Sequence, residues 1–267
     1  MKKSIMFIVC LVVPFFYLSC SKDSNPVDDN SNQNSAALFY PGEVGSNFNY
    51  AIQVDSVGSQ SISGVRLVSF TGSTKIENTD YYIQTNATTL SGITTNTNSH
   101  FRRTVGGVYY FVDTTGLYQF FPDSLSGLLT AIVDKELGIL TSNLDVNNPW
   151  KVYKMNVKYG NLFTFNIIDL TAYYQGSEEI TLNLQFGQVQ KSAEKIKYLL
   201  TLSIPNLNDP AKSTLSHFES FSWFIKDVGL VKNQGNLTVV NAISGYDIDF
   251  DDTTKTIVQN LTSYEIK

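Results

Sequence analysis

The sequence predicts an all-β fold, mainly antiparallel, in which one large curved sheet or partial barrel carries a single packed helix. The composition supports this prediction, because 13% of the residues are aromatic and only 16% are charged, as suits half-buried pleated strands. The pattern supports it as well, since apolar and polar residues alternate with a period of two through most of the chain after residue 36. A two-layer β-sandwich is the alternative, because it uses strands of the same length.

The N-terminal segment has the order of a bacterial lipoprotein signal. Lys2 and Lys3 precede an apolar run of about 14 residues, which is followed by Ser19 and Cys20. The run is shorter than the roughly 20 residues that a membrane-spanning helix needs. A basic, an apolar and a small-residue region before a cysteine direct cleavage and lipidation at that cysteine. We therefore expect residues 1–19 to be a signal peptide and Cys20 to be the lipid attachment site. An ordinary secretory peptide, with a free thiol at Cys20, is the alternative.

Residues 21–36 predict a flexible acidic tether behind the lipidated cysteine. They hold one valine and no aromatic residue, so they cannot bury enough apolar area to offset the entropy of ordering. A tether of this length holds the following domain roughly 20–25 Å from the lipid. We expect residues 20–36 to tie a single β-rich domain, residues 37–267, to the bacterial outer membrane, on its periplasmic or its cell-surface face.

Charge and cysteine usage exclude several functions. The signal carries two lysines and no acidic residue, so its removal changes the net charge from −5 to −7. An acidic domain with scattered basic residues repels nucleic acid, which is therefore not an expected partner. Because Cys10 lies in the signal and Cys20 carries lipid, no cysteine is left for a disulfide, a thiolate metal site or a nucleophile.

The alternation places the strands along the chain. Phe48, Tyr50, Ile52 and Val54 fall on one face of a first strand, with polar residues between most of them. Glycines at or near the breaks separate many of the later segments. Further strands are expected at 61–70, 79–85, 150–158, 161–168, 178–186, 195–204, 217–226, 230–232, 236–243 and 256–266.

A hairpin is expected between residues 102–105 and 108–113. Gly106-Gly107 lies between these two segments and predicts a two-residue turn, because glycine accepts a positive φ.

One segment breaks the alternation and predicts a helix at about 124–137. Asp123 is the expected N-cap and Gly138 the expected C′ residue. The apolar stripe of this helix should pack on the sheet, either as a core helix or as a lid over a cavity. Its apolar residues recur at helical spacing and are Leu125, Leu128, Leu129, Ile132 and Val133.

The sequence contains no motif of a known catalytic or phosphate-binding site. The two histidines, His100 and His217, have no partner at metal-ligand spacing, so we expect neither enzymatic activity nor a cofactor and name no catalytic residue. Asp247, Asp249 and Asp251 are calcium candidates, because alternate aspartates on one strand offer the oxygen ligands that Ca²⁺ prefers. They lack the glycine and glutamate of an EF-hand, and a solvated strand that enters a turn is the alternative.

Aromatic residues leave two interpretations open. Trp150, Trp223 and the 15 tyrosines either fill the core or form an exposed platform on which sugar rings stack.

Three short stretches carry a family resemblance. Residues 40–50 contain Pro41-x-x-x-Gly45-x-x-Phe48-x-Tyr50, residues 223–232 end in Val-Gly-Leu-Val-Lys, and residues 261–264 read Leu-Thr-Ser-Tyr. The chain thereby resembles exported β-rich bacterial lipoproteins of uncharacterised function, although Phe48 stands where Trp is usual. That family is similar in plan to the LolA/LolB-like lipoprotein carriers, in which an antiparallel sheet curls into a half-barrel around an apolar hollow. The resemblance implies no catalytic residue.

The residues of this motif are interpreted as structural. They are Pro41, Gly45, Trp223 and Gly229. Gly229 can adopt the backbone of a bulge or kink, which lets Val228 and Val231 face the core on either side.

These observations predict a membrane-anchored envelope lipoprotein that acts as a non-enzymatic binding module for a hydrophobic ligand or a partner protein on its concave face. A surface carbohydrate-binding or adhesion module is the alternative, and a hydrolase with carboxylates from distant segments comes third. The lining of the largest cavity separates them, since it is apolar in the first, aromatic and exposed in the second, and has carboxylates roughly 5–10 Å apart in the third.

Overall fold

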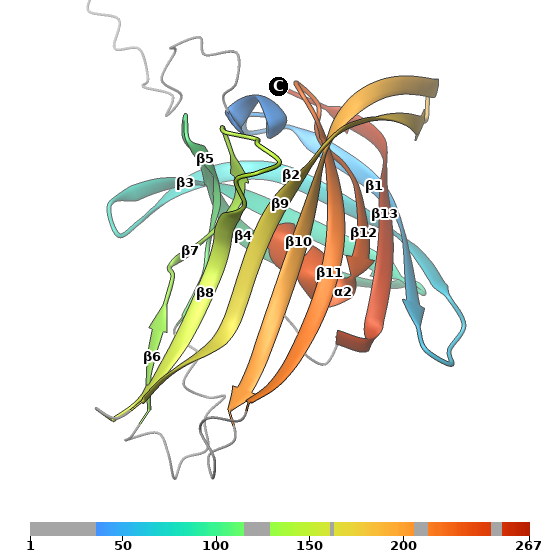
Figure 1. The fold of residues 1–267 in the computed structure, drawn as a ribbon. Coiled ribbons are helices and arrows are strands. Elements are labelled where there is room, and N and C mark those ends of the chain that lie inside the picture. The colour runs from blue at the N-terminus through green and yellow to red at the C-terminus, as the bar shows by residue number, and fades with distance from the viewer. Residues whose placement is uncertain (1–35, 115–128, 161–162, 206–212, 247–252) are drawn as a thin grey trace, which may run out of the picture.

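The chain folds as one continuous sheet of 13 antiparallel strands that curls around a short helix (Figure 1). This computed structural model describes residues 36–114, 129–160, 163–205, 213–246 and 253–267. The single curled sheet confirms the predicted all-β fold with a curved sheet, and it replaces the two-layer alternative.

The described elements follow one another in an order dominated by hairpins. They are the 3₁₀ helix η1 (Ala36–Phe39), β1 (Asn47–Ser56), β2 (Ile62–Ile76), β3 (Thr79–Leu90), β4 (Ile93–Arg103), β5 (Gly107–Phe111), β6 (Leu129–Val133), β7 (Glu136–Thr141), β8 (Trp150–Tyr159), β9 (Phe163–Leu184), β10 (Gly187–Pro205), β11 (Ser213–Ile225), β12 (Gly229–Asn236), α2 (Leu237–Ile243) and β13 (Lys255–Glu265).

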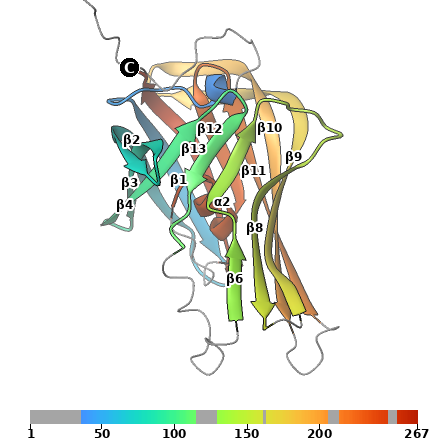
Figure 2. The same cartoon turned by 90° about the vertical axis from the view of Figure 1, so that its left-hand side faces the viewer.

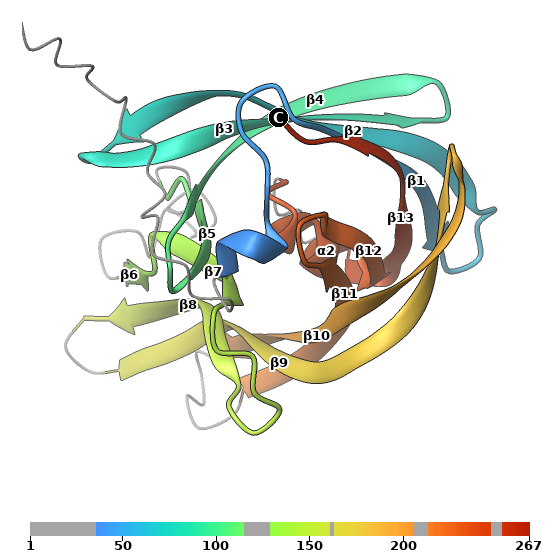
Figure 3. The ribbon, with the colours of Figure 1, turned by 90° about the horizontal axis from the view of Figure 1, so that it is seen from above.

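The order of strands across the sheet is β6-β8-β9-β10-β11-β12-β13-β1-β2-β3-β4-β5-β7. The first and last described strands, β1 and β13, pair in the middle of this order. The two edge strands, β6 and β7, follow one another in the chain, so the sheet bends round on itself. Figure 3 shows this ring-like course from above with α2 inside it, and Figure 2 shows β6 beside β8.

Between Asp134 and Lys135 the chain leaves its pairing with β8 and begins its pairing with β5. The Asp134 N–H donates to the Lys154 carbonyl oxygen at 3.1 Å, one residue beyond the β6–β8 ladder. The Lys135 carbonyl oxygen accepts from the Val112 N–H at 2.9 Å, one residue beyond the β5–β7 ladder. As a result, β7 and the start of β8 lie next to each other without a ladder between them. We call this junction the seam.

The inner face of the sheet is the core face. On β1, Phe48, Tyr50, Ile52 and Val54 are all buried, as the alternation predicted. The Gly106-Gly107 hairpin is also confirmed, because β4 and β5 pair on either side of it. The segments 161–168 and 178–186 were predicted as two strands, and their residues 163–168 and 178–184 both belong to the one long strand β9.

The predicted helix at about 124–137 is wrong over its described part. Residues Leu129–Val133 form β6 and pair with β8, and Glu136 begins β7, which contains Gly138. Asp123, Leu125 and Leu128 lie outside the described residues. Leu129, Ala131 and Val133 share one side of β6 while Ile132 is half exposed, so a period of two also fits this short apolar run.

The described helix occurs where a strand was expected, at 236–243. Asn236 caps α2, and its side-chain oxygen accepts from the Val239 N–H at 3.3 Å. Six of the seven helical residues are buried, so the helix is apolar on nearly all sides and shows no amphipathic stripe. Burial inside the curled sheet therefore outweighs the strand preference of Thr238, Val239 and Val240.

A buried arginine fixes the C-terminal half of α2 to the sheet. Arg66 on β2 is 4% exposed. Its guanidinium donates to Gln259 Oε1 at 2.7 Å, Thr88 Oγ1 at 3.1 Å and Asn241 Oδ1 at 3.3 Å, and it lies 3.7 Å from the centre of the Tyr246 ring. Burial lowers the pKa of Arg66. The carbonyl groups at the C-terminus of a helix favour a positive charge nearby, which helps this arginine remain inside.

Candidate functional site

Two of the residues interpreted as structural, Pro41 and Gly229, lie next to each other. Gly229 has φ +99°, and a Cβ at this position would lie 3.3 Å from Pro41 Cδ. Gly45, also with φ +99°, donates its N–H to the Phe70 carbonyl oxygen at 2.7 Å. These contacts are structural in kind. Cys20 and the calcium candidates Asp247, Asp249 and Asp251 lie outside the described residues.

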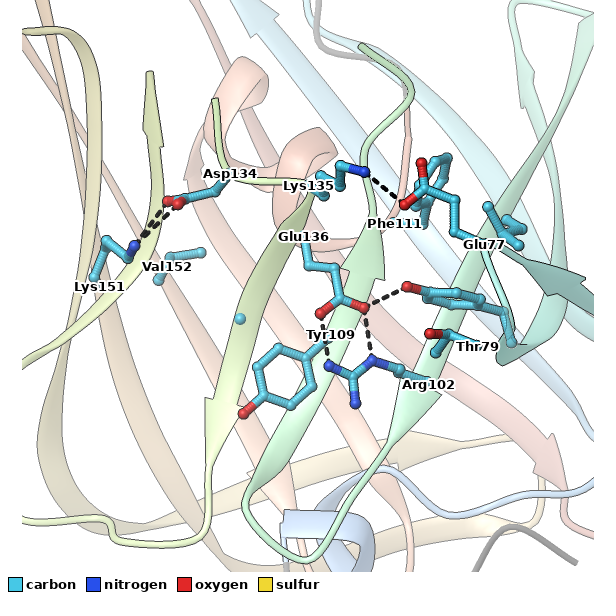
Figure 4. A pocket seen from close by; sticks show the side chains of 13 residues that line it. Glu77, Thr79, Arg102, Tyr109, Phe111, Asp134, Lys135, Glu136, Lys151 and Val152 are labelled. Carbon is cyan, nitrogen blue, oxygen red and sulfur yellow. Dashed lines mark hydrogen bonds and ion pairs between the residues drawn. The ribbon is translucent and has the colours of Figure 1, made fainter. Parts of the chain in front are cut away.

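A pocket of about 420 Å³ opens on the outer face of the sheet at the seam (Figure 4). The alternation of each strand places it there, because Tyr81, Arg102 and Tyr109 are neighbours in sequence of inward-facing residues such as Phe101 and Tyr110. The pocket is lined by Ile76, Glu77, Thr79, Tyr81, Arg102, Tyr109, Phe111, Asp134, Lys135, Glu136, Gly138, Lys151 and Val152.

The centre of this seam pocket is an ion pair between β4 and β7. Arg102 Nε and Nη2 each lie 2.6 Å from one oxygen of Glu136, and the Tyr81 hydroxyl donates to Glu136 Oε1 at 2.5 Å. Burial alone would raise the pKa of the Glu136 carboxyl, but the bonds from Arg102 and Tyr81 and the arginine charge hold this pKa below its usual value. Burial and the bond to Glu136 raise the pKa of Tyr81 to about 12. The two-point pairing fixes both planar groups in one orientation.

Aromatic rings flank this ion pair. The Arg102 guanidinium carbon lies 4.6 Å from the centre of the Tyr109 ring, within the range of a cation–π contact. A Cβ on Gly138 would lie 3.4 Å from Tyr109 Cε1, so the tyrosine ring lies over β7 at contact distance from this position. Phe111 and Tyr81 form an edge-to-face pair at 5.8 Å on the other side. The pocket thus combines apolar ring surface with fixed hydrogen-bonding groups.

Two further ion pairs lie at the rim. Lys135 Nζ is 2.5 Å from Glu77 Oε2 at the tip of the β2–β3 hairpin, and Lys151 Nζ is 3.0 Å from Asp134. Asp134 also accepts from the Lys154 N–H at 2.9 Å. With the central pair, the lining has three cations and three carboxylates, so its formal charge is zero.

The chemistry that this arrangement supports is binding. Each lining carboxylate is held by a cation, and Glu136, the central one, has a lowered pKa. An acid catalyst needs a raised pKa near the working pH. In the described ranges, no three His, Cys, Asp or Glu side chains come together as a metal site. His217 contacts Thr201 Oγ1 at 3.1 Å, away from the pocket lining.

Sequence reasoning missed the central residues of the pocket. Arg102 and Tyr109 lie in the predicted hairpin, but only the pairing of β5 with β7 brings Glu136 to them. Neither tryptophan lines this pocket: Trp150 donates to the Gly138 carbonyl oxygen at 3.0 Å, and Trp223 is 4% exposed and contacts Lys195 and Lys232.

No helix in the described ranges has the length and apolar character needed to cross a membrane.

Comparisons with known proteins give only distant likenesses. No family model matches the chain, and no curated protein matches it. A protein from Parabacteroides distasonis described as a lipoprotein is 14% identical, with a TM-score of 0.44 over 85% of this chain and 98% of that chain. A protein from Bacteroides fragilis described as exported, with a YmcC-like fold, is 8% identical, with a TM-score of 0.42 over 84% and 97%.

The hypothetical lipoprotein YmcC from Escherichia coli is 10% identical, with a TM-score of 0.30 over 81% of this chain and 84% of that chain. At these scores the likenesses carry no argument about function.

Proposed function

We propose that this protein is a lipid-anchored envelope protein that binds a neutral carbohydrate in the seam pocket and does not transform it. The observation that carries the proposal is the Arg102–Glu136 pair, with both bonds at 2.6 Å, set beside the rings of Tyr109, Tyr81 and Phe111. The anchor is the lipid expected on Cys20.

A sugar ring requires both kinds of surface that the pocket offers. Its C–H faces pack on aromatic rings, and its hydroxyls need donors and acceptors at fixed positions. Arg102 and Glu136 present such groups in a fixed plane. The equal number of cations and carboxylates in the lining favours an uncharged ligand, because an anionic or cationic sugar would meet as much repulsion as attraction.

We therefore prefer the carbohydrate alternative to the hydrophobic ligand that the sequence favoured. Inside the curl, α2 and the aromatic side chains pack against the inner face of the sheet. The cavity beside Pro41 and Gly229 holds about 20 Å³, enough for about one water molecule. A hydrophobic ligand would need a much larger volume, of roughly 300 Å³ or more.

The ion pairs also disfavour a hydrolase. A glycosidase of the usual kind needs one protonated carboxyl with a raised pKa and a second carboxylate facing it. Glu136 has a lowered pKa, and Glu77 and Asp134 are each paired with a lysine. We therefore infer binding without turnover.

The test is a binding screen of the purified mature lipoprotein against an immobilised panel of neutral and acidic glycans. We expect binding to neutral members and its loss in Tyr109→Ala, since a stacked ring contributes much of the contact. Tyr264→Ala is the matched control, because Tyr264 is 36% exposed on β13 and does not line the pocket. Equal binding by both variants, or binding confined to acidic glycans, would contradict the proposal.

A further inference from the structure

Three exposed apolar side chains lie at the end of the domain where the described chain begins. They are Val44, Phe186 and Tyr264, which are 49%, 72% and 36% exposed. Val44 precedes β1, Phe186 lies in the turn between β9 and β10, and Tyr264 is near the end of β13. Figure 1 shows η1, the C-terminus and the turn between β9 and β10 toward the same end of the sheet. This end of the domain therefore presents apolar side chains to its surroundings.

Hydrogen bonds hold the segments that carry these side chains to one another. The Gln185 N–H donates to the Thr262 carbonyl oxygen at 2.9 Å, which attaches the turn between β9 and β10 to the last part of β13. The Lys267 N–H donates to Ser46 Oγ at 3.0 Å, which attaches the C-terminus to the segment before β1. The three apolar side chains are thus carried by adjoining segments, and exposed apolar groups that gather in this way mark a contact surface, unlike single scattered ones.

The hairpin that carries Phe186 is fixed to the rest of the domain. Leu182 and Leu184, just before the turn, are both buried and belong to the core. Further along β9, the Glu178 carboxylate accepts a hydrogen bond from the indole N–H of Trp223 on β11. The ring of Phe186 is therefore held at a defined position, and a contact made by this ring does not have to order the hairpin first.

Neither the turn nor the core explains a phenylalanine at position 186. Leu184 pairs with Gly187, so Gln185 and Phe186 form a two-residue turn. Such turns favour Asn, Asp and Gly, and a ring that stays exposed contributes little to the core. The apolar area of this ring remains in water until something outside the domain covers it.

The carboxylates next to Val44 and Tyr264 in the sequence are paired with cations. Glu43 pairs with Arg103 at 3.0 Å, and Glu265 pairs with Lys267. These two carboxylates therefore add no uncompensated negative charge to this end, although the chain as a whole is acidic. A phospholipid surface, whose headgroups are zwitterionic or anionic, meets little repulsion from them.

We propose that this end of the domain docks on the phospholipid bilayer that holds the lipid of Cys20, with the ring of Phe186 inserted into the interface. The docking rests on the lipid anchor of the proposed function. Ala36, where the described chain begins, is fully buried in η1, so the residues that lead to Cys20 leave the domain at this end. A tether of roughly 20–25 Å keeps the bilayer at a high effective concentration near Phe186, and aromatic side chains favour the membrane interface.

The opposite end of the sheet also has an exposed phenylalanine, but it is far from the anchor. Phe163 begins β9 and is 48% exposed, and the 22 residues of this strand separate it from the turn that holds Phe186. To bring Phe163 to the bilayer, the tether would have to stretch along the domain, at a cost in conformational entropy. Phe163 therefore serves as an internal comparison for Phe186.

Fluorescence quenching by labelled lipids tests which end docks. The mature lipoprotein is incorporated into phosphatidylcholine vesicles with a thiol-reactive dye on Gln188→Cys, an exposed position close to Phe186. The mature chain offers no other free thiol, because Cys10 lies in the signal and Cys20 is expected to carry lipid. We expect a lipid with a nitroxide near its headgroup to quench this dye and to leave a dye on Thr164→Cys, at the start of β9, unquenched. Equal quenching of the two dyes, or quenching of neither, would overturn the proposal.

Phe186→Ser distinguishes insertion of the ring from mere nearness to the bilayer. In the protein labelled at position 188, this change should lower the ratio of docked to undocked domain about tenfold, because it removes one apolar ring from the interface. Phe163→Ser in the same labelled protein is the matched control, since it removes the same kind of ring from the other end of β9. Equal quenching in the two serine variants would contradict the insertion of Phe186.

Vesicle flotation of the same samples separates a failure of docking from a failure of the anchor. A protein that floats with the vesicles while its dye at position 188 stays unquenched refutes the docking and leaves the lipid anchor intact. A protein that does not float, and whose Cys20 thiol reacts with the dye, refutes the anchor and the docking with it. A surface that binds a partner protein instead of lipid gives no quenching, because the vesicles contain no other protein, and this result also overturns the proposal.

Discussion

Trp150 of β8 donates its indole N–H to the carbonyl oxygen of Gly138 in β7 at 3.0 Å, and this bond connects two strands that no ladder joins. The carbonyl of Gly138 thus holds the seam, while its bare Cα lines the pocket beside the Tyr109 ring. One glycine therefore serves both the closure of the sheet and the shape of the proposed binding site.

Gly138→Ala should impair ligand binding more than stability. A Cβ at this position would lie 3.4 Å from Tyr109 Cε1 and 3.5 Å from its Cδ1, so the added methyl group would touch the ring and occupy part of the pocket that Gly138 lines. Gly138 is not among the glycines with positive φ, so alanine causes no backbone strain. We expect weaker binding to any neutral glycan that the wild type binds, with a melting temperature within about 4 °C.

Gly106→Ala is the matched control for this substitution. A Cβ on Gly106 would have only Thr104 Oγ1 nearby, at 3.7 Å, which is ordinary contact. If Gly138→Ala binds as the wild type does, the Tyr109 ring does not form the binding surface.

Sequence alternation was sufficient to predict the fold class and most strands. It succeeded where one face of a strand is buried, as at Phe48 and Tyr50 of β1. It failed at two short apolar runs, because a period of two and a helical period are hard to distinguish over five to seven residues. Asn236, which is the N-cap of α2, was the available sequence signal for this helix.

The seam pocket could not be predicted from the sequence. It depends on which strands become edges, and this follows from long-range pairings such as Tyr110 with Leu137. Glu136 also fell within the predicted helix, so its position opposite Arg102 was hidden. A lining that mixes aromatic residues with ion pairs has no sequence motif, because its members come from β2, β3, β4, β5, β7, β8 and the turns between strands.

Glu136 should make the stability of the domain depend on pH. Its carboxyl pKa is lower in the folded state than its ordinary value of 4.5. A lowered folded pKa contributes stability that is present above the unfolded pKa and is lost as pH falls through the folded pKa. In urea unfolding, the difference between the wild type and Glu136→Gln should therefore be largest above about pH 5 and shrink below it.

Glu265→Gln is the control for this measurement. Glu265 contacts Lys267, but both side chains are more than half exposed, and such pairs contribute little to stability. A difference between wild type and Glu136→Gln that grows as pH falls would contradict the assigned role of the Arg102 pair.

Arg66→Lys should destabilise the domain strongly. Lysine keeps the buried charge but cannot reach Gln259 and Asn241 with two separate donors, as the arginine does at 2.7 and 3.3 Å. We expect a loss of about 3 kcal/mol in the free energy of unfolding, measured by urea denaturation. Arg66→Met should cost less, because it removes the buried charge. A loss under about 1 kcal/mol for Arg66→Lys would mean that this arginine does not fix α2 to the sheet.

Cys20→Ala should release the protein from the membrane. A single acyl chain binds a bilayer only weakly, at about 0.8 kcal/mol per buried CH₂, whereas two or three chains on one cysteine anchor a protein almost permanently. Without Cys20 no acyl chain can be attached at the predicted cleavage site, so the protein should move from the membrane to the soluble fraction and lose labelling by radioactive palmitate. Cys10→Ala is the matched control, because Cys10 lies inside the apolar run of the signal. Unchanged membrane association of Cys20→Ala would show that something other than lipid holds the protein there.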